Sequence, residues 1–197
     1  MEFEYYFGPA LYVAPVVRRA QTSRTFWLPP GKWVDWWTLS PQSGGAMVTR
    51  DAPLGVVPLY LRSGGIVPLL DASVQTIAPD QDNTVVSAPE IAGVLDVRVA
   101  IDRTAASASA TLTDGTTLSA SYGAGSVMLP AGLAQAQGDA DLAACDNCGR
   151  IDSIAGGAMR VRVTTPSEAS GDMTLGGLSL HHGGALKKVR WEVVVLP

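Results

Sequence analysis

Four tryptophans, Trp27, Trp33, Trp36 and Trp37, lie within eleven residues of the N-terminal part of the chain. Aromatic side chains offer a large apolar face, on which a sugar ring can stack, so Trp33, Trp36 and Trp37 are candidate carbohydrate-binding residues. Residues 33–37 are expected to form a strand, in which neighbouring side chains point to opposite faces. At least one of Trp36 and Trp37 should therefore pack inside the protein. Asp35, between Val34 and Trp36, is expected to make structural hydrogen bonds.

A second candidate site lies near the C-terminus, where residues 177–181 (GLSLH) differ at one position from the G-x-S-x-G nucleophile motif. The fifth residue is histidine instead of glycine, and the segment resembles a strand and not the strand-to-helix turn of that motif. Ser179 and His181 would share one face of the strand, and Asp172 is near in sequence. A Ser–His–Asp hydrolase site, using His181 or His182, is one interpretation. An ordinary strand is the other.

The two cysteines form a C-x-x-C pair, Cys145 and Cys148, and the chain has two histidines, His181 and His182. Together they could supply two sulfur and two nitrogen ligands to a metal. The spacing matches no zinc-finger pattern, and adjacent histidines diverge on a strand. A local disulfide or a structural turn is the alternative, so we predict neither a metal nor a cofactor. The glycine pairs lack the pattern of a phosphate-binding loop and are expected to be turns.

The composition excludes several classes of protein. The chain has 197 residues and a net charge of −4, with 47% hydrophobic and 16% charged residues. Such a chain can build a core, which argues against disorder, and it lacks the basic runs expected of nucleic-acid binding. No apolar stretch reaches the roughly 20 residues that cross a bilayer, and no basic segment before an apolar core marks a signal peptide. We expect a soluble protein and predict no compartment.

The pattern of short apolar segments between glycines and prolines predicts an all-β chain. Residues 7–17 form an unbroken apolar run, typical of a strand that is buried on both faces. Residues 94–101 alternate with period two, and Asp114-Gly115 is typical of a hairpin turn. Residues 71–89 are rich in Asp, Ser, Gln and Pro and are predicted to be a linker. Residues 131–144 are expected to be a short helix or a loop.

Three ordered fragments connect the N-terminal third to a known family. They are residues 7–16 (FGPALYVAPV), residues 27–37 (WLPPGKWVDWW) and residues 51–68 (DAPLGVVPLYLRSGGIVP). In order and spacing they resemble the C-terminal region of glycoside hydrolase family 31, the α-glucosidase and α-xylosidase family. Residues 110–117 (ATLTDGTT) with Tyr122 are similar to a later turn of that family, but without its acidic cluster.

The resemblance implies two antiparallel β-sandwich modules and an N-terminal strand left over from a (β/α)8 barrel. The implied divisions are residues 1–20 for the barrel strand, 21–70 for a proximal sandwich, 71–89 for a linker and 90–197 for a distal β-domain. Family members cleave glycosidic bonds with two carboxylates, which lie upstream of the resembling segment. None of these catalytic residues is therefore expected in this chain.

The resemblance favours an accessory C-terminal module of a family 31-like glycoside hydrolase, with carbohydrate contact through the tryptophans. The alternative is a stand-alone hydrolase that uses the serine and histidine site or the metal site. An apolar strand without its barrel would leave an unpaired edge and exposed surface. We therefore expect a homo-oligomer, or a catalytic barrel as partner, and neither nucleic acid nor a membrane.

Overall fold

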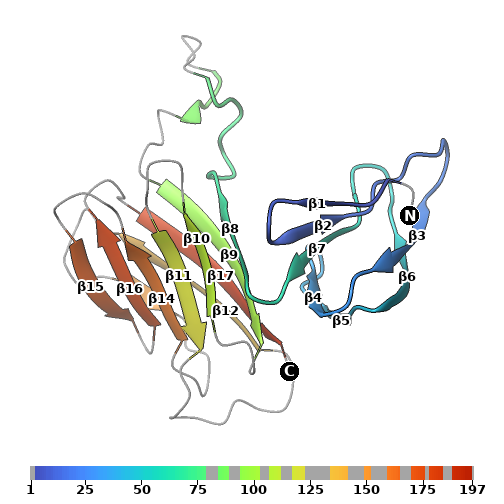
Figure 1. Cartoon of the computed structure of the whole chain (residues 1–197). Coiled ribbons are helices and arrows are strands. Elements are labelled where there is room, and N and C mark those ends of the chain that lie inside the picture. Colours follow the sequence, from blue (N-terminus) through green and yellow to red (C-terminus); the bar gives the residue numbers. More distant parts are fainter. Residues whose placement is uncertain are drawn as a thin grey trace.

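The computed structural model of the chain describes residues 3–78, 84–88, 94–102, 107–111, 117–122, 134–141, 149–151, 159–164, 170–175, 178–183 and 188–196. Within these residues the secondary structure consists of strands, so the predicted all-β class is confirmed (Figure 1). Nearly all the strand pairs are antiparallel, and the parallel pair of β9 (Val94–Asp102) and β17 (Lys188–Leu196) is the exception among the pairs described. None of the described residues belongs to a helix that is long and apolar enough to cross a membrane.

The N-terminal part is built from two antiparallel sheets. The larger sheet has the strand order β1-β2-β7-β4-β5, with β1 (Tyr5–Phe7), β2 (Leu11–Val13), β4 (Lys32–Asp35), β5 (Pro41–Ser43) and β7 (Leu59–Arg62). The smaller sheet pairs β3 (Ser23–Leu28) with β6 (Ala46–Asp51). The two sheets enclose a buried, mostly aromatic cluster, which contains Tyr12, Ala14, Phe26, Leu28, Trp33 and Tyr60.

The segment that resembles a barrel strand is part of this sandwich in the structure. β1 and β2 form a hairpin, and β2 pairs antiparallel with β7. The turn between them contains Gly8 with a positive φ of 65°, a backbone conformation that glycine adopts without strain. The predicted single buried strand over residues 7–17 is wrong in its extent, because the turn at residues 8–10 divides this segment and the buried strand β2 covers only Leu11–Val13. β1 lies at the sheet edge and is exposed.

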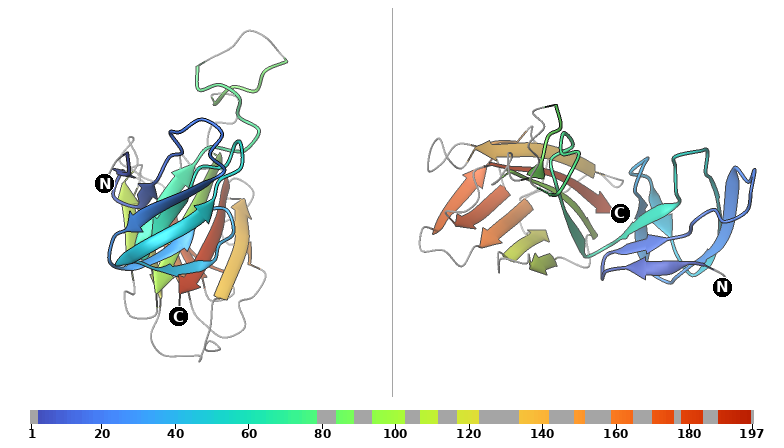
Figure 2. Two further views of the ribbon diagram at one scale, coloured as in Figure 1. Left: turned by 90° about the vertical axis from the view of Figure 1, so that its right-hand side faces the viewer. Right: turned by 90° about the horizontal axis from the view of Figure 1, so that it is seen from above.

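The C-terminal part contains three further sheets. The largest has the order β13-β12-β17-β9-β8, with β8 (Gly65–Leu69), β9 (Val94–Asp102), β12 (Ala134–Asp141), β13 (Gly149–Ile151) and β17 (Lys188–Leu196). The others are β10 (Ser107–Thr111), β11 (Thr117–Tyr122) and β14 (Met159–Thr164), and the hairpin of β15 (Ser170–Leu175) with β16 (Leu178–Gly183). These sheets form the second body seen in Figure 2.

Pairing along the sheets tests two of the local predictions. β10 and β11 pair antiparallel around residues 112–116, so the predicted hairpin is confirmed. The expected helix or loop over residues 131–144 is wrong for residues 134–141, because β12 pairs with β17 at eight successive positions. This pairing satisfies the main chain of an alanine- and glutamine-rich segment whose local preference does not favour a strand.

A buried apolar cluster joins the two parts of the molecule. It combines Ala10, Leu11, Val34 and Leu61 of the N-terminal sheet with Ala100, Val194 and Leu196 of β9 and β17. At this junction the Gly64 amide donates to the Ala100 carbonyl at 2.8 Å, and the Ser63 hydroxyl donates to Asp102 at 2.9 Å. A Cβ on Gly65 would lie 2.7 Å from the Arg62 carbonyl oxygen, so the close approach of the chain here requires glycine. The two parts therefore share one continuous core.

Candidate functional site

Two of the three candidate tryptophans, Trp36 and Trp37, lie in a turn that we call the tryptophan turn, residues 35–40. β4 ends at Asp35 instead of continuing to Trp37, so the predicted strand over residues 33–37 is two residues too long. The Asp35 amide donates to the Ser40 carbonyl, and the Leu39 amide donates to the Asp35 carbonyl, both at 2.9 Å. The chain reverses direction here, which places Trp36 and Trp37 in a turn and removes the alternation expected of a strand.

The side chain of Asp35 stabilises the tryptophan turn. Its side chain is buried, and its Oδ1 accepts hydrogen bonds from the amides of Trp37 at 3.0 Å and Thr38 at 2.9 Å. Arg50 on β6 donates from Nε to Oδ2 at 2.6 Å. Burial pushes the pKa of Asp35 upward, but the bonds from Arg50, Thr38 and Trp37 outweigh it, so the pKa lies below its usual value. Asp35 therefore makes the structural hydrogen bonds expected of it.

Trp33 packs in the core of the N-terminal part. Its side chain is 1% exposed, and its indole Nε1 donates to the Pro29 carbonyl at 2.8 Å. Its ring lies 5.8 Å from the Tyr12 ring, centroid to centroid. A Cβ on Gly44 would lie 1.8 Å from the Pro29 carbonyl oxygen, so glycine at this position allows the turns to close over the indole. In this arrangement Trp33 offers no free ring face to a ligand.

Trp36 lies between the two parts of the molecule. Its ring packs against the apolar cluster that joins them, and the guanidinium carbon of Arg98 lies 4.1 Å from the ring centroid. Arg98 also donates from Nη1 to the Trp36 carbonyl at 2.8 Å. One face of this indole is therefore occupied by an arginine of β9, which has a favourable cation–π geometry.

Trp37 is the tryptophan of the turn whose ring is open to solvent. Its side chain is 47% exposed, and its indole Nε1 donates to the Val57 carbonyl at 2.7 Å. This bond fixes one edge of the ring while leaving a face available. An aromatic ring held at a surface by its polar atom is suited to stacking on an apolar ligand face. Trp27, on β3, is also partly exposed, but it lies outside the turn.

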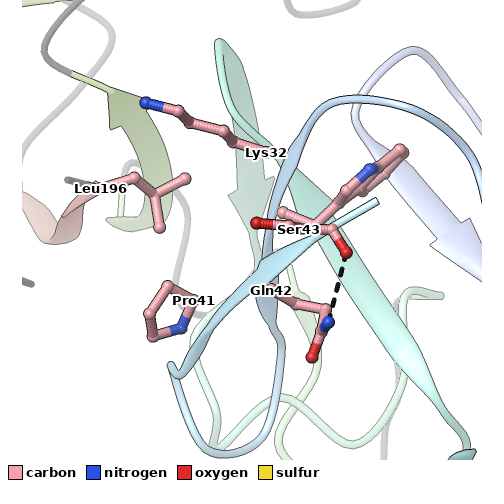
Figure 3. Close-up of a pocket in the computed structure, with 6 residues that line it drawn as sticks. Lys32, Pro41, Gln42, Ser43 and Leu196 are labelled. Carbon is pink, nitrogen blue, oxygen red and sulfur yellow. Dashed lines mark hydrogen bonds between the residues drawn. The ribbon is translucent and has the colours of Figure 1, made fainter. Parts of the chain in front are cut away.

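Two hollows lie beside these residues. A groove of about 570 Å³ runs between residues 15–22 and residues 52–57, and the last of these, Val57, anchors Trp37. A smaller hollow of about 230 Å³ lies where the edge strand β5 approaches the end of β17 (Figure 3). Its lining residues are Lys32, Trp33, Pro41, Gln42, Ser43 and Leu196. Sequence reasoning missed both hollows, because each is formed by segments that are distant in sequence.

Several carboxylates of the described residues are paired with arginines. These pairs are Glu4–Arg24 at 2.9 Å, Asp35–Arg50 at 2.6 Å, Asp96–Arg190 at 2.5 Å and Glu192–Arg98 at 2.7 Å. Asp71 also contacts Arg190. Hydrogen bonds from Ser73, and then from Arg190, hold the pKa of Asp71 well below its usual value. A general acid needs the opposite shift, a raised pKa, so Asp35 and Asp71 are suited to structural ion pairing.

The hydrolase candidates lie on the β15–β16 hairpin. The register places Asp172 opposite His181, while Ser179 pairs with Thr174 and His182 with Gly171. Residues directly opposite in an antiparallel pair are neighbours, so pairing brings Asp172 and His181 together from positions nine residues apart. Residues 178–181 of this motif belong to the strand β16, as the strand interpretation expects. The catalytic interpretation of Ser179 stays a prediction.

The structure describes two of the four candidate metal ligands. Cys145 and Cys148 lie outside the described residues, and His181 and His182 lie on β16. In the part of the chain that the structure describes, no group of three or more His, Cys, Asp or Glu could hold a metal ion. The metal interpretation therefore also stays a prediction.

Comparison with known proteins bears on the N-terminal third. Residues 1–67 match the model of the glycosyl hydrolase family 31 C-terminal domain, which confirms the resemblance over this segment. The chain is 43% identical over 61 residues to a 1,3-alpha-isomaltosidase of Kribbella flavida, covering 31% of this chain and 8% of that protein. It is 32% identical over 97 residues to an alpha-xylosidase of Saccharolobus solfataricus, covering 49% of this chain and 12% of that protein.

Solved structures of family 31 enzymes are also similar to part of the chain. A family 31 alpha-xylosidase from a soil metagenome, complexed with xylose, is 44% identical over 32% of this chain and 9% of its own, with a TM-score of 0.31. A Flavobacterium johnsoniae dextranase of family 31 is 18% identical over 61% of this chain and 15% of its own, with a TM-score of 0.45. The chain spans between 6% and 12% of the length of four curated relatives that it matches.

Proposed function

We propose, from the match of residues 1–67 to the C-terminal domain of glycosyl hydrolase family 31, that this chain is an accessory β-module of such an enzyme. In this role it supports a catalytic part and supplies no catalytic carboxylate of its own. The match to the C-terminal domain is the observation that carries the proposal. The arginine pairing of Glu4, Asp35 and Asp96 supports it, because a carboxylate held in an ion pair is poorly suited to proton transfer.

We further propose that the module contacts carbohydrate through Trp37. Its exposed indole, anchored on Val57 beside the groove of residues 15–22 and 52–57, is the support for this contact. The matching relatives include an isomaltosyltransferase, a 1,3-alpha-isomaltosidase and an alpha-xylosidase. The ligand class proposed for this chain is therefore an α-linked gluco- or xylo-oligosaccharide.

Isothermal titration of the full chain with isomaltose, maltose and isoprimeverose, an α-linked xylosyl-glucose, tests the carbohydrate contact, with tryptophan fluorescence as a second signal. We expect binding by the natural chain and its loss in Trp37→Ala. The matched control is Trp27→Ala, which removes a partly exposed tryptophan from the other sheet and should leave binding unchanged. No heat and unchanged fluorescence with all three sugars would overturn this part of the proposal.

Turnover tests the accessory role. We expect the chain alone to hydrolyse no p-nitrophenyl glycoside, because the proposed role assigns glycosidic cleavage to another part of the enzyme. A reproducible rate that disappears when a carboxylate of the chain is replaced would contradict the accessory role.

A further inference from the structure

The peptide unit between Trp36 and Trp37 is held at both of its polar ends. Its carbonyl oxygen accepts a hydrogen bond from Arg98 Nη1 at 2.8 Å, and its amide donates to Asp35 Oδ1 at 3.0 Å. A peptide unit is planar, so binding both ends fixes the orientation of the whole plane. That plane fixes the N–Cα bond of Trp37, from which the side chain leaves the main chain at the φ angle of this residue.

The two residues that hold this peptide belong to different sheets. Asp35 ends β4 of the N-terminal sheet, whereas Arg98 lies on β9 of the C-terminal sheet, 62 residues further along the chain than Trp36. Arg98 is itself fixed by its ion pair with Glu192, its cross-strand neighbour on β17, at 2.7 Å. The orientation of the turn thus depends on how the C-terminal sheet is docked.

The guanidinium group of Arg98 makes three contacts at once. Its flat face stacks on the Trp36 ring, its Nη1 reaches the Trp36 carbonyl and its Nε lies beside Glu192. Arginine provides these contacts because its donors form a rigid planar fork. Lysine keeps the charge but cannot supply the same geometry. The arrangement therefore predicts a specific requirement for arginine beyond a positive charge.

We infer that Arg98 is a positioning residue for Trp37, through which the C-terminal sheet sets the orientation of the proposed carbohydrate-contacting ring. This inference rests on the proposed function where it concerns sugar affinity. Its structural part, the dependence of Trp37 on Arg98, stands on the described contacts alone and has its own measurement.

Fluorine NMR of the full chain labelled with 5-fluorotryptophan measures the structural part, because the five tryptophans give separate probes of their surroundings. The Trp37 resonance is assigned from its loss in Trp37→Phe. We expect Arg98→Ala to shift or broaden the Trp37 resonance. Arg98→Lys should bring the thermal stability closer to that of the natural chain than it brings the Trp37 resonance. Arg62→Ala, which removes an exposed arginine of β7 outside the groove, is the matched control and should leave the resonance unchanged.

Affinity measures the functional part. We expect Arg98→Ala to weaken oligosaccharide binding by about tenfold, the size of one hydrogen bond to a charged group. Trp36→Phe keeps the carbonyl that Arg98 binds, so its affinity should stay close to that of the natural chain.

A folded Arg98→Ala protein with an unchanged Trp37 resonance would overturn the inference, as would equal losses of affinity in Arg98→Ala and Trp36→Phe. Absence of sugar binding by the natural chain would overturn the proposed function and leave the NMR test of Arg98 in place.

Discussion

At the scale of single residues, Asp35 shows how a candidate for chemistry serves structure. Its carboxylate caps two amides of the tryptophan turn and pairs with Arg50 of the neighbouring sheet. A buried charge of this kind is tolerated because both carboxylate oxygens accept hydrogen bonds, Oδ1 from two amides and Oδ2 from Arg50. Replacement of the charge therefore affects the turn and the contact between the sheets together.

Asp35→Asn is expected to lower the free energy of unfolding by about 1–3 kcal/mol at neutral pH, because Arg50 loses its charged partner. The pKa of Asp35 is lowered in the folded protein. The stabilisation by its charge is thus complete above the carboxyl pKa of the unfolded chain, about 4, and is lost as the pH falls through the folded pKa. Urea unfolding of both proteins should show a difference at about pH 7 that shrinks towards about pH 3. A difference that is independent of pH would contradict this origin.

At the same scale of single residues, substitution of Ser179 distinguishes the accessory role from the stand-alone hydrolase. If Ser179 forms a hydrolase site with His181 or His182 of β16, Ser179→Ala and one of His181→Ala and His182→Ala should lower the rate of p-nitrophenyl ester hydrolysis. We expect equal rates for the natural chain and all three variants, because the accessory role requires no nucleophile. A loss of rate by about a hundredfold or more, the range of general acid–base effects, would favour the hydrolase.

At the scale of elements, the two sheets on either side of the junction share a core. Val34 and Leu61 of the N-terminal sheet pack with Ala100 and Val194 of β9 and β17, all of them fully buried. Such contacts couple the unfolding of one part to that of the other, because separating the sheets exposes apolar surface on both. Unfolding of the described parts should then be cooperative.

Leu61→Ala is expected to cost about 2–5 kcal/mol, the range for leaving a cavity in a packed core. Because Leu61 belongs to the shared cluster, the loss should appear in the fluorescence of the N-terminal tryptophans and in far-ultraviolet circular dichroism alike. Leu54→Ala is the matched control, since Leu54 is fully exposed and its removal should change stability by about 0.5 kcal/mol or less. A large effect on only one signal would mean that the two parts unfold independently.

At the scale of the whole molecule, β1 is an uncovered edge. Tyr5, Tyr6 and Phe7 are all exposed there, and β1 has one neighbour, β2, in its sheet. An exposed aromatic edge strand favours pairing with another chain. Homo-oligomer formation, or association with a catalytic barrel, stays a prediction.

Light scattering at about 100 μM tests self-association. We expect an oligomer, and Phe7→Lys should shift it towards the monomer, because a charge on an edge strand opposes pairing. Met47→Lys places the same charge on an exposed methionine of β6 and should leave the oligomer intact. A monomeric natural chain at this concentration would contradict the prediction.

The sequence by itself determined the all-β class, the hairpin of β10 and β11 and the resemblance of residues 1–67 to family 31. These follow from local signals, because turn residues, apolar alternation and ordered motifs are all written within short segments. Local signals within residues 131–144 did not predict the strand at residues 134–141, because this strand forms through its pairing with the distant β17.

The tertiary structure alone decided which tryptophan is available to a ligand. Trp33, Trp36 and Trp37 are chemically alike and close in sequence, yet one is buried, one is stacked by Arg98 and one is exposed. The difference depends on where β4 ends and on an arginine 62 residues away from Trp36. Burial and side-chain direction are set by contacts between distant segments, and such contacts form only when the sheets have packed together.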